Sequence, residues 1–193
     1  MEVTKLDAAR WQLGTAIWLY FHEADPISIH TLTKAAYDVI NALNKKRHSP
    51  MGLDDMMLKD LGDEFLSSKA QRRMFHDFLN EAANFFKHGN SDPTATLSFD
   101  TSWNEVLLFD AVRKYCSFVA DCPKEMLIYQ LWFELSRPEI QLDIPNNMAQ
   151  LETFREMLLK DGRKGFYQHA RTFFGDEENF AKIRELFLKF ETT

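Results

Sequence analysis

The feature that most constrains this chain is a helical repeat of apolar residues that runs through most of its length. Between residues 4 and 23 the apolar positions recur at three- and four-residue spacing, at Leu6, Ala9, Leu13, Ala16, Ile17, Tyr20 and Phe21. This spacing places them on one face of a helix that must be buried against other elements. Seven glycines and six prolines in 193 residues leave few interruptions. The sequence therefore predicts an all-α protein.

The length and the pattern predict a single domain over residues 1–193, built as an antiparallel bundle of about eight or nine helices. A helical hairpin covers residues 4–44, with Asp25 as the cap and Pro26 as the first residue of its second helix. A strongly amphipathic helix covers residues 68–88, and additional helices fill residues 101–193. The last three of these, residues 147–160, 165–174 and 176–190, are separated by Gly162 and Gly175. The segment 94–99 alternates like a strand, but one strand makes no sheet.

Two segments of the second half, residues 102–121 and 123–137, are apolar almost all round. Helices with so little polar surface are buried on several sides, either at the centre of a domain or against a partner. A homodimer interface is therefore one of two expectations for them. The longest apolar stretch, residues 126–133, is far shorter than the roughly 18 residues that cross a bilayer. With no leader signature at the N-terminus, we expect a cytoplasmic protein without a membrane partner.

The charge and the cysteines narrow the function classes. A formal net charge of −6 repels nucleic acid at long range. Cys116 and Cys122 fit neither a disulfide framework nor a C-x-x-C metal pair, and we expect both to be reduced thiols. Phosphate-cradling loops, dinucleotide fingerprints and nucleophile elbows are missing from the sequence, so no cofactor is predicted.

The richest group of polar side chains lies where the helix of residues 68–88 ends. Asn84, Lys87 and His88 share its last turn, and Gly89 follows. Residues four apart lie on one helical face, so Asn84 and His88 can act on one group. In a catalytic interpretation His88 transfers a proton, Asn84 holds a phosphate oxygen or orients a nucleophile, and Lys87 neutralises charge. In the alternative, His88 complements the helix dipole and Asn84 is a solvated surface residue.

Further polar residues extend this candidate site. The polar face of the same helix continues back through Asp77 and Arg73, which we predict as binding residues. On the second helix of the hairpin, His30 and Lys34 lie on a mostly polar line with Asn41, and they complete the predicted binding set.

The turn of the hairpin carries the other group with metal-ligand chemistry, namely His22, Glu23, Asp25 and His30. Divalent metals accept such mixtures of ligands. The sequence has no H-E-x-x-H motif and no paired E-x-x-H motif, so a capped helical turn is the preferred interpretation and no metal site is predicted.

The helix of residues 4–23, the segment D-P-I-S-I-H-T-L-T-K-A-A-Y-D-V-I and the end A-N-F-F-K-H together resemble the HEPN superfamily of small all-α bundles with an R-N-x-x-x-H type motif. The resemblance covers about Leu6 to His88. It implies a metal-independent ribonuclease that works as a dimer with facing motifs, often as a toxin of a toxin–antitoxin or anti-phage system. Asn84 matches the motif's asparagine and His88 its histidine, whereas Ala83 occupies the arginine position.

That departure matters because the arginine would stabilise the charge that develops on the phosphorane during attack by a ribose 2′-hydroxyl. Alanine cannot do this, and Lys87 or Arg73 is the candidate replacement. Two functions follow. One is a HEPN-like, degenerate RNA-binding or RNA-cleaving component of a bacterial defence or toxin–antitoxin system. The other is a non-enzymatic helical protein whose polar face binds a protein partner or supports the fold.

Overall fold

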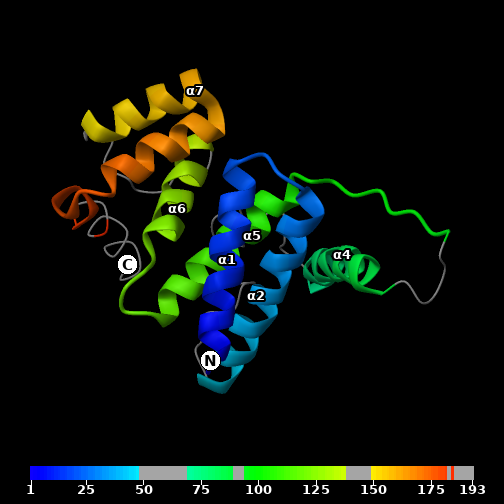
Figure 1. Cartoon of the computed structure of the whole chain (residues 1–193). Helices are drawn as coiled ribbons and strands as arrows, with labels where there is room; N and C mark the ends of the chain where they lie inside the picture. Colours follow the sequence, from blue (N-terminus) through cyan, green and yellow to red (C-terminus); the bar gives the residue numbers. More distant parts are fainter. Residues whose placement is uncertain (48–68, 89–93, 138–148, 182–183, 185–193) are drawn as a thin grey trace.

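The structure, a computed structural model, describes residues 1–47, 69–88, 94–137, 149–181 and 184. These residues form helices α1 (Lys5–Phe21), α2 (Pro26–Arg47), α4 (Lys69–Lys87), α5 (Trp103–Phe118), α6 (Lys124–Ser136) and α7 (Ala149–Phe173), and they contain no strand. The all-α class is therefore confirmed, while the number of helices and their antiparallel order stay predictions. Figure 1 shows α4 beside α2 on one side of the molecule and α7 beside α6 on the other.

The first two helices begin at side-chain caps. Thr4 Oγ1 accepts a 3.1 Å hydrogen bond from the Asp7 N–H, and Asp7 Oδ2 accepts one of 3.0 Å from the Thr4 N–H. At the start of α2, Asp25 Oδ2 accepts a 2.9 Å bond from the Ser28 N–H, and Pro26 is the first helical residue, as predicted. These bonds satisfy backbone groups that a helix start leaves unpaired. Hydrogen bonds from Thr4 and Ser28 hold the pKa of Asp7 and Asp25 below the usual value.

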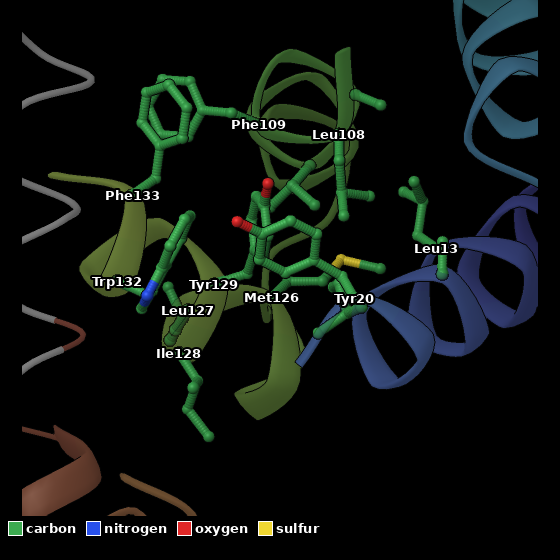
Figure 2. Packing of buried hydrophobic residues seen from close by; sticks show 14 of the residues in the cluster. Leu13, Tyr20, Leu108, Phe109, Met126, Leu127, Ile128, Tyr129, Trp132 and Phe133 are labelled. Carbon is green, nitrogen blue, oxygen red and sulfur yellow. The ribbon is translucent and has the colours of Figure 1, made fainter. Parts of the chain in front are cut away.

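Helices α5 and α6 lie at the centre of the described core. α5 packs against α1, α2 and α6, and α6 also packs against α1 and α7. In Figure 2, Tyr20 of α1 packs edge-on against Tyr129 and Trp132 of α6, with ring centroids 5.3 and 5.0 Å away, while Phe109 stacks on Phe133 at 4.0 Å. This central position accounts for the apolar pattern all round both helices. The homodimer stays a prediction.

Helix α7 is broken at Gly162, where the sequence predicts that one helix ends. Its φ of 64° and ψ of −167° lie in a region that an L side chain disfavours, and only glycine adopts it readily. The turn that follows Phe173 contains Gly175, and residues 177–181 are helical again. Both predicted glycine boundaries are therefore confirmed.

Cys116 and Cys122 form a disulfide, so the prediction of two reduced thiols is wrong. Helix α5 ends at Phe118, and the turn of residues 119–123 returns the chain to the last turn of that helix. The two Cα atoms are 4.9 Å apart, within the range that a disulfide requires. The same turn is held by Arg184, which lies 3.1 Å from Asp121 Oδ1.

No helix among the described residues is both long and apolar enough to cross a membrane.

Candidate functional site

The three predicted catalytic residues lie together at the C-terminal end of α4. Asn84, Lys87 and His88 are exposed, and the His88 N–H donates a 2.9 Å hydrogen bond to the Asn84 carbonyl. Phe85 is 40% exposed and joins them on this side of the helix. We call Asn84, Phe85, Lys87 and His88 the α4 tip. Because they occupy neighbouring positions around one helix end, a single partner can contact all four.

Ala83, at the motif's arginine position, faces the protein interior and is only 3% exposed. Arg73 cannot replace the missing arginine, because it precedes Asn84 by eleven residues, which is about 16 Å along a helix. It lies 3.7 Å from Asp77, and both side chains are largely exposed. Such a surface pair contributes little stability. Lys87 is therefore the cation that the α4 tip offers.

The predicted binding residue His30 is fully buried between α2, α4 and α5. Its Nδ1 lies 3.0 Å from Asn104 Oδ1, and Asn104 Nδ2 donates to the Pro26 carbonyl at 2.9 Å. Since a carbonyl can only accept, the amide orientation is fixed and Nδ1 of His30 carries a proton. Phe86 and Phe99 meet the imidazole edge-on, with ring centroids 5.8 and 5.2 Å away.

Burial lowers the pKa of His30, because the charged ring would lose its hydration. The hydrogen bond to Asn104 and the nearby Leu79 carbonyl oppose this lowering of the His30 pKa. No described group is in hydrogen-bonding geometry with the other ring nitrogen, Nε2. The charges of Lys34 and Lys87 lower the pKa further. His30 is thus a neutral core histidine that joins three helices.

Lys34, the other predicted binding residue of α2, is also buried, and its Nζ lies 2.5 Å from Asp38 Oδ1. Two helical turns further along α2, Asn41 accepts a 2.8 Å hydrogen bond from Lys114 of α5. The Lys114 ammonium also lies 4.8 Å from the centre of the Tyr37 ring. The polar line of α2 is therefore covered by neighbouring helices and belongs to the interior, not to an accessible surface.

The polar residues of the α1–α2 turn contact separate partners. His22 stacks on Trp18 with centroids 4.2 Å apart, and its Nδ1 lies 2.7 Å from the Trp18 carbonyl oxygen. Asp25 caps α2, and Glu23 lies 3.6 Å from Arg163 Nη2. Among the residues that the structure describes, no three His, Cys, Asp or Glu side chains gather as ligands for a metal ion.

A cavity of about 350 Å³ opens where this turn meets the start of α5 and the middle of α7. Its polar lining consists of Tyr20, Glu23, Asp100, Thr101, Ser102, Asn104, Glu105 and Arg163, and its apolar lining of Ala24, Pro26 and Ile29. None of these residues except Glu23 is in a group that the sequence singled out for chemistry.

Glu105 is the centre of a polar network beside this cavity. Tyr20 donates a 2.7 Å hydrogen bond to Glu105 Oε1, and Arg137 pairs with Oε2. The Tyr129 hydroxyl donates to the Glu105 carbonyl at 3.0 Å. The guanidinium of Arg163 lies 4.6 Å from the centre of the Tyr20 ring. These contacts bring α1, α5, α6 and α7 together around Glu105 and Tyr20.

The pKa values of two phenols and one guanidinium in this network are raised. Burial, reinforced by the Glu105 carboxylate, raises the pKa of Tyr20 strongly, and burial also raises the pKa of Tyr129. Burial would lower the pKa of Arg163, but the nearby Tyr20, Glu23 and Glu105 outweigh it and raise the pKa. Both phenols therefore stay neutral and the guanidinium stays charged near pH 7, so these groups supply no general base.

A second cavity, of about 280 Å³, lies between α1 and the start of α6 and includes Trp11, Gly14 and Met126 in its lining. Trp11 and Trp18 are 54% and 48% exposed. Helix α1 therefore carries aromatic surface on the side away from its buried stripe.

The sequence missed the Glu105 cavity because its residues come from separate segments that only the fold brings together. One signal was present. Asn104, Glu105, Asp110 and Lys114 are polar residues in a segment that the sequence predicts to be buried on several sides, and buried polar groups need specific partners.

Comparison with known proteins assigns no family to this chain, and the HEPN resemblance is neither supported nor contradicted by it. No family model matches the chain, and no curated protein or solved structure matches it at a significant level.

Proposed function

We propose that this chain is a non-enzymatic helical protein that binds a protein partner through the α4 tip. The observation that carries the proposal is the burial of Ala83 beside the exposed Asn84 and His88. A ribonuclease site of the HEPN type needs a fixed cation at that position. Here the position faces the core, so the tip lacks the group that would stabilise a phosphorane.

The composition of the α4 tip supports a protein partner. Phe85 supplies an exposed aromatic anchor, Asn84 and His88 supply hydrogen-bonding groups, and Lys87 supplies one charge. Aromatic anchors with few charges are typical of the centre of protein–protein interfaces.

The charge of the surrounding face supports the same choice. Among the side chains of α4 that the structure describes, the exposed cations Arg73 and Lys87 are matched by the exposed anions Asp77 and Glu81. RNA-binding surfaces instead gather cations on one face, because phosphate contacts dominate their affinity.

A photo-crosslinking amino acid at position 85 tests the proposal in the cells that make this protein. Leu159 of α7 is the matched control, because it is apolar and 88% exposed, and α7 lies on the opposite side of the molecule from α4 (Figure 1). We expect a defined protein adduct from position 85 that does not form from position 159 and that weakens in the Asn84→Ala, His88→Ala variant. The absence of an adduct from position 85, or the same adducts from both positions, would contradict the proposal.

The second candidate is a HEPN-like ribonuclease of a defence or toxin–antitoxin system, acting as a homodimer in the cytoplasm. The exposure of Asn84 and His88 one turn apart favours it, since both reach solvent on the same side of α4. Cleavage of a mixed-sequence RNA in the presence of a metal chelator decides between the candidates. Cleavage by the wild type that His88→Ala abolishes would favour the nuclease, whereas equal background from both proteins would favour the non-enzymatic function.

A further inference from the structure

We propose that the exposed face of α1 joins two copies of this chain in an antiparallel dimer. Trp11, Gly14, Thr15 and Trp18 recur along that face at three- and four-residue spacing, opposite the stripe that α1 buries. The two tryptophans are 54% and 48% exposed. Exposed aromatic side chains that share one helix face are typical of protein–protein contacts. The inference concerns α1 and does not depend on the function of the α4 tip.

The order of these residues is self-complementary. When a two-fold axis relates two identical antiparallel helices, positions at equal distances on either side of the axis face each other. Trp11 and Trp18 are equidistant from the point between Gly14 and Thr15. An axis at that point places Trp11 of each copy opposite Trp18 of the other. The small side chains lie at the crossing, where an added Cβ on Gly14 would meet no atom within 4 Å, so the two backbones can approach closely.

The charges at the two ends of α1 favour the antiparallel order. In the first half of the helix the exposed cations Lys5 and Arg10 outnumber the one acidic residue, Asp7. The exposed anions Glu23 and Asp25 follow the end of the helix. An antiparallel second copy brings the cations of each helix toward the anions of the other, and it also opposes the two helix dipoles. Such complementarity sets the orientation of two partners more than their affinity.

The cavity between α1 and the start of α6 gives the second copy's tryptophan a place to bind. It has a volume of about 280 Å³, Trp11 lies in its lining, and Pro123 and Met126 add apolar lining. Because Trp18 of the second copy lies opposite Trp11, its ring reaches this cavity, and the two-fold axis repeats the contact. Aromatic anchors that fill pockets supply most of the binding energy in many interfaces.

Trp18 is held in position by contacts within its own chain. Its ring stacks on His22 with centroids 4.2 Å apart, and His22 meets the ring of Tyr167 on α7 edge-on at 5.9 Å. A side chain that is already fixed loses little rotamer freedom on binding, which favours association.

Sedimentation velocity of the full chain, measured from about 1 to about 200 µM, tests the proposal. One helix face with a cavity beside it forms a smaller interface than obligate dimers bury, so we expect a monomer–dimer equilibrium in the micromolar range. A monomer at every concentration would overturn the proposal.

Alanine variants locate the interface. Trp11→Ala and Trp18→Ala each remove both tryptophan contacts of the dimer, so we expect each variant to dimerise at least about tenfold more weakly than the wild type. Leu159→Ala and Phe85→Ala truncate exposed apolar side chains of α7 and α4, and we expect both to dimerise like the wild type. Circular dichroism verifies that all four variants fold. An equal loss in Leu159→Ala, or a loss in Phe85→Ala with wild-type dimerisation of Trp11→Ala, would overturn the proposal.

A mixture of Trp11→Ala with Trp18→Ala tests the register. A mixed dimer keeps one intact contact, because the unchanged Trp18 of the first variant lies opposite the unchanged Trp11 of the second. We therefore expect the mixture to dimerise about tenfold more tightly than either variant alone. A mixture that dimerises no more tightly than the separate variants would overturn the antiparallel arrangement.

Discussion

The hydroxyl of Tyr20 donates a 2.7 Å hydrogen bond to Glu105, and this contact joins α1 to the first turn of α5 across 85 positions of the chain. Tyr20 is only 3% exposed, and the carboxylate that it contacts also pairs with Arg137. The contact therefore fixes one wall of the cavity and links the N-terminal hairpin to the central helices.

Replacement of Tyr20 by Phe removes only the hydroxyl of this contact. We expect the free energy of unfolding to fall by about 2 kcal/mol, because buried hydrogen bonds to charged groups contribute about 1.5–3 kcal/mol. Urea denaturation measures the change. Tyr115→Phe is the control, since Tyr115 is equally buried but its hydroxyl has no hydrogen bond among the described residues, and we expect a change within about 0.5 kcal/mol. Equal losses in both variants would mean that the bond to Glu105 contributes nothing.

The buried His30 predicts a dependence of stability on pH. Its pKa in the folded protein is below 6.5, so the unfolded chain binds the proton first as the pH falls. This residue's contribution to the free energy of unfolding is complete above pH 6.5 and decreases below it. We expect wild-type stability to fall from about pH 7 to pH 5, a range in which ordinary carboxylates stay ionised.

The matched variants for this experiment are His30→Gln and His169→Gln. Both remove one histidine, but His169 is exposed near the end of α7. Denaturation at several pH values should show a smaller slope in His30→Gln and the wild-type slope in His169→Gln. A wild-type slope in His30→Gln would show that another group titrates.

The helical class, the start of α2 at Asp25 and Pro26, and the break at Gly162 were predictable because each depends on residues close together in the sequence. Capping, proline geometry and glycine geometry act within one or two helical turns. The exposed polar face of α4 followed from periodicity for the same reason.

The features that the sequence did not predict depend on which elements meet. Periodicity identified the polar line through His30 and Lys34, but α4 and α5 cover that line, so its side chains are buried with partners. The pairing of Cys116 with Cys122 depends on where α5 ends. Glu105 and Arg163 line one cavity only because the fold brings the start of α5 and the middle of α7 to the same hairpin turn.

Reduction of the Cys116–Cys122 disulfide should destabilise the protein. The bridge closes a short loop, with a sequence separation of 6, and restricts the unfolded chain. For a loop of that length the expected loss is about 2 kcal/mol. Equilibrium urea denaturation with and without a phosphine reductant measures it, and the Cys116→Ala, Cys122→Ala variant should be insensitive to the reductant. Identical midpoints for the wild type in both conditions would contradict a stabilising bridge.

Two glycine-to-alanine variants test the backbone at the break in α7. Gly162 has a φ of 64° and a ψ of −167°, so Gly162→Ala should cost about 1–3 kcal/mol through backbone strain. Gly14 lies inside α1, and an added Cβ would meet no atom within 4 Å. Gly14→Ala should therefore stabilise the protein by about 0.5–1 kcal/mol, because alanine loses less conformational entropy in a helix. Urea denaturation of the two variants should give changes of opposite sign. A neutral or stabilising Gly162→Ala would mean that α7 runs through residue 162 as a continuous helix, and Arg163 would then lose the position from which it reaches Glu23 and the ring of Tyr20.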